Sequence, residues 1–425
     1  MQSLPRVAGA IATALFGATI ANAALPSYET VELEARSNLL VNDNGFNLPP
    51  GSSFNSISAD INASAEVAFR VQVVPDADNP GQSRPGVWAG GHGNGSLIYT
   101  GPIDASVDND ACLNDSGDIA FTLSDGGVGN NLYLYDATAG SASAIGTLPV
   151  IPNSYGNPCV NEAGDIGFQA SFSSGRAFAA RIGGSTAIYT GDAGTSPGSP
   201  YTYLYTPSFN RTGIIAAKVA TSSDQFTKVE IRTFASDGTS QLVLANASTD
   251  AQSPYSRFDN SLALSDNGII AVVATRVSDN RRVVVRSDGI TTTEIAAVDP
   301  AGTVRELDSF APAINDSGWV AFRAKDAAGQ AIYVGDGSAL VRVIGNADAV
   351  ATDLGLGQLG QNNATDPVFA GKPSINANGD IAFVAGVYPQ GDNQTEWGSG
   401  VFVAYATNAA QDLVFADGFD GAATR

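Results

Sequence analysis

A nine-residue motif occurs seven times in this chain, and this repetition restricts the possible folds more than any other feature. Each copy reads aliphatic or aromatic residue, Asn, two variable residues, Gly, a variable residue, Ile or Val, a small residue and usually Phe. The copies begin at Ile61, Leu113, Val160, Phe209, Leu264, Ile314 and Ile375. They are 47 to 61 residues apart. A repeat of this length indicates a supersecondary unit that buries its core only against its neighbours.

The motif predicts a strand, a tight turn and a second strand. The Asn side chain can close an Asx-turn, and the Gly three residues later accepts a positive φ. After the Gly, bulky residues alternate with a small one, so one face of the strand supplies volume and the other allows close approach. Ser265 replaces the Asn in the fifth copy and Ala65 replaces the Gly in the first. We therefore expect those two turns to be the least regular.

A second hairpin follows each motif. Residues 331–334 and 340–344, for example, are apolar runs on either side of Gly335-Asp336-Gly337. Asp-Gly between such runs is a strong hairpin signal. Each unit is then a four-stranded antiparallel meander, and seven units predict an all-β fold, a seven-bladed β-propeller. The alternative is another β-repeat solenoid, whose coils are usually shorter.

A propeller must close its ring, and two segments could supply the missing strand. Residues 29–36 alternate like a strand and precede the first motif as the fourth strands precede later ones. Residues 412–415 follow the last predicted strand and compete for the same place. The pattern favours the N-terminal segment as the outer strand of the seventh blade.

Three insertions interrupt the repeat, at residues 70–86, 346–371 and 386–400. The connections between second and third strands and those between successive blades emerge on one face of a propeller. The insertions belong to the first and seventh blades, which become neighbours on closure. We therefore expect them to meet in one sector of one face, where long loops on a rigid scaffold often carry function.

These insertions contain the candidate ligand-binding residues, Asp76, Asp78, Tyr388, Asp392, Glu396 and Trp397. Asp76 and Asp78 offer hard oxygen ligands that suit Ca²⁺, although the spacing of a known calcium loop is missing. The other four combine aromatic faces with carboxylates, which suits a sugar or a cationic ligand. The alternatives are a solvated acidic loop and a loop anchored by its own Trp.

Charge and histidine content exclude several function classes. With 42 acidic and 21 basic residues the net charge is −21, which disfavours nucleic acid and anionic membranes as partners. His92, the single histidine, lies in a glycine-rich turn, so no histidine cluster for a metal can form and a rigid catalytic triad is disfavoured. No catalytic residue is assigned, since a carboxylate pair for glycoside hydrolysis cannot be chosen from sequence.

The two cysteines occupy equivalent positions in consecutive repeats. Cys112 and Cys159 each lie two residues before the motif Asn. Inner strands of a propeller approach one another near the axis, which allows a Cys112–Cys159 disulfide. Equivalent side chains in neighbouring blades, however, point the same way round the ring, and a bridge needs Cα atoms within about 7 Å. A disulfide and two separate thiols both remain open.

The chain ends indicate export. Residues 1–23 combine Arg6, an apolar Ala-rich run and an Ala-Asn-Ala cleavage site, which predicts a signal peptide cleaved after Ala23. No transmembrane segment is predicted for the mature chain. We expect one propeller domain at residues 24–411 and a tail at 412–425 that could act as a sorting segment.

The repeated Asn-x-x-Gly-x-Ile/Val-Ala-Phe, often preceded by a proline such as Pro207, Pro312 or Pro373, resembles the bacterial tandem-repeat proteins with an NxxGxxxF/W signature, the choice-of-anchor repeat family. The resemblance covers about residues 50–405. It implies an exported, extracellular or envelope-associated protein with a propeller-like fold, and it carries over no catalytic residue.

Together these observations predict an exported binding or scaffold propeller with a carbohydrate or protein ligand and no identified cofactor, Ca²⁺ being the one candidate. A polysaccharide-active hydrolase or lyase is the alternative.

Overall fold

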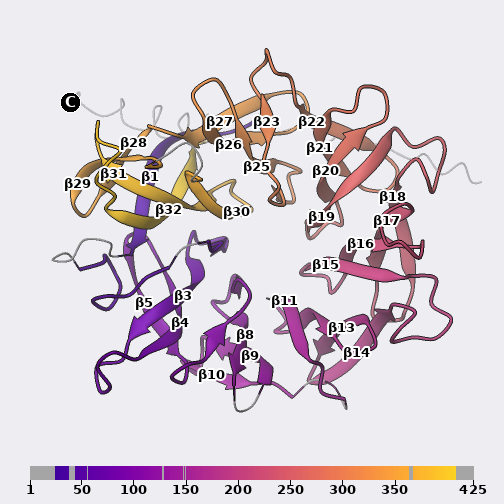
Figure 1. The fold of residues 1–425 in the computed structure, drawn as a ribbon, viewed down its shortest axis with the longest axis horizontal. Helices are drawn as coiled ribbons and strands as arrows, with labels where there is room; N and C mark the ends of the chain where they lie inside the picture. Colours follow the sequence, from indigo (N-terminus) through magenta and orange to yellow (C-terminus); the bar gives the residue numbers. More distant parts are fainter. Residues whose placement is uncertain are drawn as a thin grey trace, which may run out of the picture.

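The computed structural model describes residues 24–37, 44–54, 56–126, 129–146, 148, 150–362 and 367–407. These residues form seven antiparallel sheets around a central axis, a seven-bladed β-propeller (Figure 1). The predicted fold class is therefore confirmed. The predicted signal peptide, the competing closing segment at 412–415 and the C-terminal tail lie outside the described residues.

Each blade contains strands A to D, counted from the axis outward. Blade 1 consists of β2 (Asp60–Ile61), β3 (Val67–Pro75), β4 (Ser83–Gly91) and β5 (Asn94–Thr100). In blade 2, strand A has two pieces, β6 (Ser106–Val107) and β7 (Cys112–Leu113), followed by β8 (Ile119–Asp125), β9 (Gly129–Asp136) and β10 (Ser141–Ala144). Blade 3 consists of β11 (Ser154–Val160), β12 (Ile166–Ser171), β13 (Arg176–Ile182) and β14 (Ser185–Gly191).

Blade 4 consists of β15 (Tyr203–Phe209), β16 (Ile215–Ala220), β17 (Val229–Phe234) and β18 (Ser240–Ala245). Blade 5 consists of β19 (Tyr255–Leu264), β20 (Ile270–Arg276), β21 (Arg282–Ser287) and β22 (Thr292–Ala297). In blade 6, strand A again has two pieces, β23 (Glu306–Leu307) and β24 (Ala313–Ile314), followed by β25 (Val320–Lys325), β26 (Gln330–Gly335) and β27 (Leu340–Gly345).

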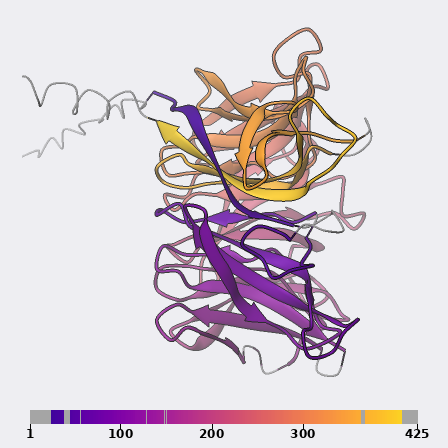
Figure 2. The same cartoon turned by 90° about the vertical axis from the view of Figure 1, so that its left-hand side faces the viewer.

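Blade 7 is closed by the N-terminal strand, as the sequence pattern favours. Its strands A to C are β30 (Phe369–Ile375), β31 (Ile381–Pro389) and β32 (Gly398–Thr407), and strand D is β1 (Ser27–Arg36). The β1–β32 pairing runs from Ser27 opposite Thr407 to Arg36 opposite Gly400, and the two strands lie side by side in Figure 2. The first and last described strands therefore share one sheet.

The insertion before blade 7 forms a hairpin, although we expected only a long loop there. Strands β28 (Ala349–Thr352) and β29 (Gly355–Leu359) pair with each other, and β29 also pairs with the end of β31. The buried guanidinium group of Arg36 donates to both carboxylate oxygens of Asp353 at the hairpin tip, at 2.9 and 2.8 Å. This ion pair fixes the hairpin to the closing strand.

The hydrophobic core lies between blades, because the small motif residue of each blade packs beside the first motif residue of the next. Ala68 shares a buried cluster with Leu113, and Ala321 borders Ile375 in the same way. At the seam between blades 3 and 4 the small residue is Gly167, where a Cβ atom would lie 2.3 Å from the ring of Phe209. Phe209, the bulkiest residue at the first motif position, therefore packs against Gly167, the smallest residue at the small-residue position.

All seven motif turns have the same backbone hydrogen bond, so the expectation that two of them are less regular is wrong. Ala65 adopts a φ of 60°, the same left-handed region as the motif glycines, and its N–H donates to the Asn62 carbonyl at 3.1 Å. Ser265 Oγ accepts from Ile269 N at 3.0 Å, as the Asn Oδ1 atoms do elsewhere. The hydrogen-bonded strands on both sides of the turn determine its geometry. For Ala65, the left-handed backbone conformation costs about 1–2 kcal/mol.

No helix long and apolar enough to cross a membrane occurs in the part of the chain that the structure describes.

Candidate functional site: the axial channel

The motif Asn side chains form a ring of hydrogen bonds around the axis, one at each seam between blades. Asn114 Nδ2 donates to the Asn161 carbonyl at 2.9 Å, and Asn376 Nδ2 donates to the Asn62 carbonyl at 2.9 Å, which closes the ring. In blade 5, where Ser265 replaces the Asn, Asn267 Nδ2 donates to the Asp316 carbonyl instead, at 2.8 Å. The amide thus closes its own turn with one end and links two blades with the other.

A second set of polar side chains links the blades nearer the start of the A strands. Most are the residue that follows the last position of the motif, which is usually Phe, and they donate to backbone carbonyls of the next blade. Arg70 Nη1 donates to Val107 O at 2.8 Å, Gln169 Nε2 to Tyr205 O at 2.8 Å and Lys218 Nζ to Phe258 O at 2.9 Å. Register shifts in the A strands release these carbonyls from the ladder. The channel wall is therefore held at two levels.

We name the two ends of the channel after the strand connections that surround them. The A–B face carries the motif turns, and the D–A face carries the links between successive blades together with the B–C connections. The two ends differ in chemistry.

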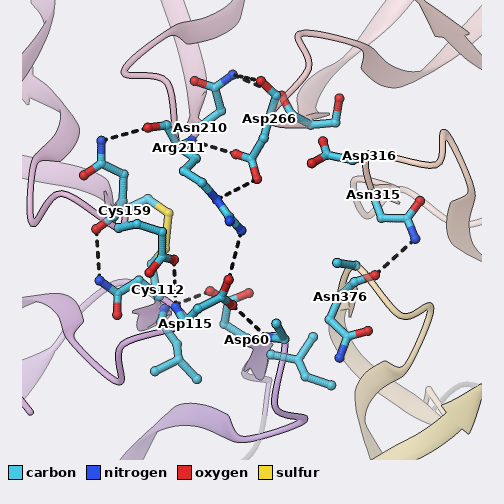
Figure 3. Close-up of a pocket in the computed structure, with 18 of the residues that line it drawn as sticks. Asp60, Cys112, Asp115, Cys159, Asn210, Arg211, Asp266, Asn315, Asp316 and Asn376 are labelled. Atoms are coloured by element: carbon cyan, nitrogen blue, oxygen red, sulfur yellow. Dashed lines mark hydrogen bonds and ion pairs between the residues drawn. A yellow bond between two sulfur atoms is a disulfide. The ribbon is translucent and has the colours of Figure 1, made fainter.

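At the A–B face, Arg211 extends across the mouth of a cavity of about 180 Å³ (Figure 3). Its Nη2 lies 3.0 Å from Asp115 of blade 2, and its Nε lies 3.1 Å from Asp266 of blade 5. Burial acts to lower the pKa of Arg211, but the carboxylates of Asp266, Asp115, Glu162 and Asp316 outweigh it and raise the pKa. The guanidinium group therefore remains charged and narrows this mouth.

A Cys112–Cys159 disulfide joins strands A of blades 2 and 3, with the two Cα atoms 4.9 Å apart. Of the two alternatives that the sequence leaves open, the structure has the bridge. The inner strands are close enough because they converge on the axis, where both cysteines line the channel. This bridge lies between the two rings of interblade hydrogen bonds.

At the D–A face the channel opens into a cavity of about 380 Å³, and all seven blades contribute to its wall. Its volume lies within the range typical of small-molecule sites. Its lining combines hydroxyl groups with proline rings and one exposed aromatic residue: Ser58, Thr206, Ser208, Ser261, Ser309, Ser374, Pro158, Pro207, Pro312, Pro373 and Phe310. We call this space the D–A cavity.

Few charged groups reach the D–A cavity. They are Asp60, Asp110 and Lys372. Burial raises the pKa of Asp60, while Lys372 and a hydrogen bond from Leu113 N act to lower it. The cavity therefore suits a ligand that is recognised mainly by hydroxyl groups and apolar ring faces.

The blade 7 insertion is held by its own contacts. Tyr388 is buried, and its hydroxyl donates to Glu396 Oε2 at 3.1 Å. Trp397 packs against the core between blades 6 and 7, and Asp392 Oδ1 accepts from Gln394 N at 2.6 Å. That backbone hydrogen bond holds the pKa of Asp392 below its usual range.

The β28–β29 hairpin joins this insertion through Gln358, which donates to Asn393 Oδ1 at 3.3 Å and accepts from Gly391 N at 2.8 Å. The insertions at residues 346–371 and 386–400 therefore meet, which is part of the expected convergence of all three.

In blade 1, the contacts of Asp76 stay within the β3–β4 hairpin. It accepts from Asn79 Nδ2 at 3.1 Å, Asp78 N at 2.9 Å and Arg84 Nε at 2.9 Å. The Asn79 hydrogen bond is the largest of the causes that lower the pKa of Asp76. Asp78 is exposed. None of the six sequence-predicted residues lines either axial cavity.

His92 lies in the C–D turn of blade 1 and is exposed, with a φ of 55°. Its ring stacks on Tyr405, and Nδ1 lies 3.1 Å from the Tyr405 hydroxyl. This contact links blades 1 and 7. Within the described residues, no group of three or more His, Cys, Asp or Glu side chains is placed to hold a metal ion.

The sequence matches no protein-family model and no curated protein. Among solved structures, a Pyrococcus horikoshii acylaminoacyl peptidase is similar at 12% identity and a TM-score of 0.49, over 85% of this chain and 54% of that one. TolB from Acinetobacter baumannii follows at 14% identity and a TM-score of 0.40, over 65% of this chain and 63% of that one. A chain of a mitotic checkpoint complex matches at 11% identity and a TM-score of 0.45, over 96% and 99% of the two chains. Similarities this distant carry no argument about function.

Proposed function

We propose that this chain is an exported binding or scaffold propeller that receives its ligand in the D–A cavity. The observation that carries the proposal is a cavity of about 380 Å³ walled by all seven blades. The interblade hydrogen bonds near the start of the A strands and the disulfide surround it, so the wall is organised before a ligand arrives.

The lining chemistry favours an uncharged carbohydrate as the ligand class. Serine and threonine hydroxyls can exchange hydrogen bonds with sugar hydroxyls, while proline rings and Phe310 offer apolar surface to the faces of a sugar ring. Export and membership of the choice-of-anchor repeat proteins belong to the same proposal, supported by the signal-peptide pattern and the repeated motif.

The proposal is tested by screening the mature protein on an array of neutral glycans and then filling the D–A cavity. Thr206→Trp and Ser261→Trp, in blades 4 and 5, should each abolish binding of the glycans that the unmodified protein retains. Ser143→Trp, on the exposed outer strand of blade 2, should not. A melting curve for each variant shows whether the propeller is intact.

Two results would contradict the proposal. One is glycan binding that survives both cavity-filling substitutions, or the absence of any retained glycan. The other is release of new reducing ends from the retained glycans, which would favour the polysaccharide-active enzyme instead.

A further inference from the structure

A third cavity, of about 540 Å³, lies at the seam between blades 4 and 5. We call it the seam cavity. Its wall comes from β16, from the B–C connection of blade 4, from the link between the blades and from the start of β19. Its volume falls within the range of small-molecule sites.

The seam cavity is positively charged in a strongly acidic protein. Among the described residues, its lining contains Lys218 and Arg257 and no Asp or Glu, although the chain has twice as many acidic as basic residues. Two carboxylates lie nearby. Asp259 is 2.5 Å from Arg282, and Asp224 accepts hydrogen bonds from Phe226 N, Thr227 N and Ser222 Oγ in its own loop. A cavity of this kind attracts anions.

Lys218 supplies a fixed cation in the wall. Its side chain is 6% exposed, and Nζ donates to Phe258 O and Asn260 Oδ1, both at 2.9 Å, above the ring of Tyr205. Burial lowers the pKa of Lys218 to about 8, against the opposing effect of Asp259, so the amine is still mainly charged at neutral pH. Two of its three N–H groups are bonded to Phe258 and Asn260, so these two bonds fix the position of the charge in the wall.

Arg257 supplies a second cation that is available for contact. It is exposed, and within the described residues its guanidinium group makes no hydrogen bond or ion pair. A guanidinium group can bind a carboxylate through two parallel hydrogen bonds.

Phe226 presents an aromatic face at the same cavity and is 72% exposed. Its loop is fixed by Asp224, whose Oδ1 accepts from Phe226 N at 3.1 Å, Thr227 N at 3.0 Å and Ser222 Oγ at 2.6 Å. An exposed aromatic ring on a fixed loop is suited to packing against a flat or ring-shaped apolar body.

We propose that the seam cavity binds a small carboxylate whose body is a ring, with Arg257 pairing with the carboxylate and Phe226 packing against the ring. A hexuronate and an aryl carboxylate share this chemistry. The site is separate from the D–A cavity and does not depend on it.

Isothermal titration of the mature protein with D-galacturonate, benzoate and D-galactose tests the proposal and separates the two sources. We expect one or both carboxylates to bind in a way that depends on Arg257, and any binding of neutral galactose, as in the D–A cavity, not to depend on it. Arg257→Gln should weaken binding by roughly ten-fold to a hundred-fold, since it removes a charge-assisted hydrogen-bond pair. Phe226→Ala should also weaken it. Raising the salt concentration should reduce affinity.

Arg281→Gln is the matched control, because Arg281 is an exposed arginine in the B–C connection of blade 5 and pairs with Asp279. It should leave binding unchanged. The proposal is overturned if neither carboxylate binds, if Arg257→Gln weakens galactose binding as much as galacturonate binding, or if Arg257→Gln has no more effect than Arg281→Gln.

Discussion

The carboxyl group of Glu34 is fully buried at the seam where blade 7 meets blade 1. Its Oε2 accepts from Gly93 N at 2.9 Å, while Oε1 has no hydrogen-bond partner in the described structure. Burial raises the pKa of Glu34 to about 7, and the charge of Glu32 adds to the effect, while the Gly93 hydrogen bond and His92 oppose it. Closure of the ring therefore places an acid where its neutral form is preferred.

A pH dependence follows from this raised pKa. Between its ordinary value of 4.5 and about 7, the folded protein keeps a proton that the unfolded chain has released, so stability falls as pH rises through this window. Glu34→Gln, which removes the titration, should be more stable than the unmodified protein at pH 8 by about 1–3 kcal/mol, with the gain vanishing near pH 4.5. Urea unfolding at several pH values measures it. Glu29→Gln, exposed on the same strand, should show no such gain, and a pH-independent difference for Glu34→Gln would contradict the argument.

Strand-level features were predictable from sequence wherever local chemistry determines them. The hairpin predicted at Asp336-Gly337 forms between β26 and β27, as expected. The role of Asn114 Nδ2 depends on a neighbouring blade that no local pattern describes. The sequence contains one indication of this role. An Asx-turn can also be closed by Asp or Ser, yet six of the seven copies have Asn, whose side chain both accepts and donates hydrogen bonds.

The fit between Gly167 and Phe209 gives an element-scale prediction. Gly167→Ala should destabilise the protein by about 1–3 kcal/mol, because the new Cβ would lie 2.3 Å from the Phe209 ring. Adding Phe209→Ala should reduce the cost of the substitution, since it removes the ring carbons that lie 2.3 Å from the new Cβ. A double-mutant cycle from urea unfolding measures the coupling, expected at about 0.5–3 kcal/mol. Gly146→Ala is the control, because nothing lies within 4 Å of its added Cβ. Additive effects of the two substitutions would show that the blades do not pack through this pair.

At the scale of the whole molecule, blade number and the closing strand were predictable because each repeat has its own motif and β1 has its own alternation. The axial cavities were not, because their walls combine single residues from seven distant segments, such as Thr206 and Ser261. Tyr388 was a candidate because it lies in a long insertion. The length and composition of that insertion do not reveal that the Tyr388 hydroxyl is already bonded to Glu396. In the part of the other blades that the structure describes, the β28–β29 hairpin has no counterpart, so the repeated motif could not predict it.

Closure by β1 gives the prediction that concerns the molecule as a whole. β1 supplies the outer strand of blade 7, buries Leu33 and Ala35, and carries Arg36, which anchors the β28–β29 hairpin. Removing residues 24–37 from the mature chain should cost more than about 5 kcal/mol, comparable with the whole stability of many domains, and abolish the cooperative urea transition. Removing residues 412–425, which contain the competing closing segment, should leave the transition midpoint unchanged. Circular dichroism during urea unfolding compares the two truncations. If the shorter N-terminus unfolds normally and the shorter C-terminus does not, the ring is closed by the other end of the chain.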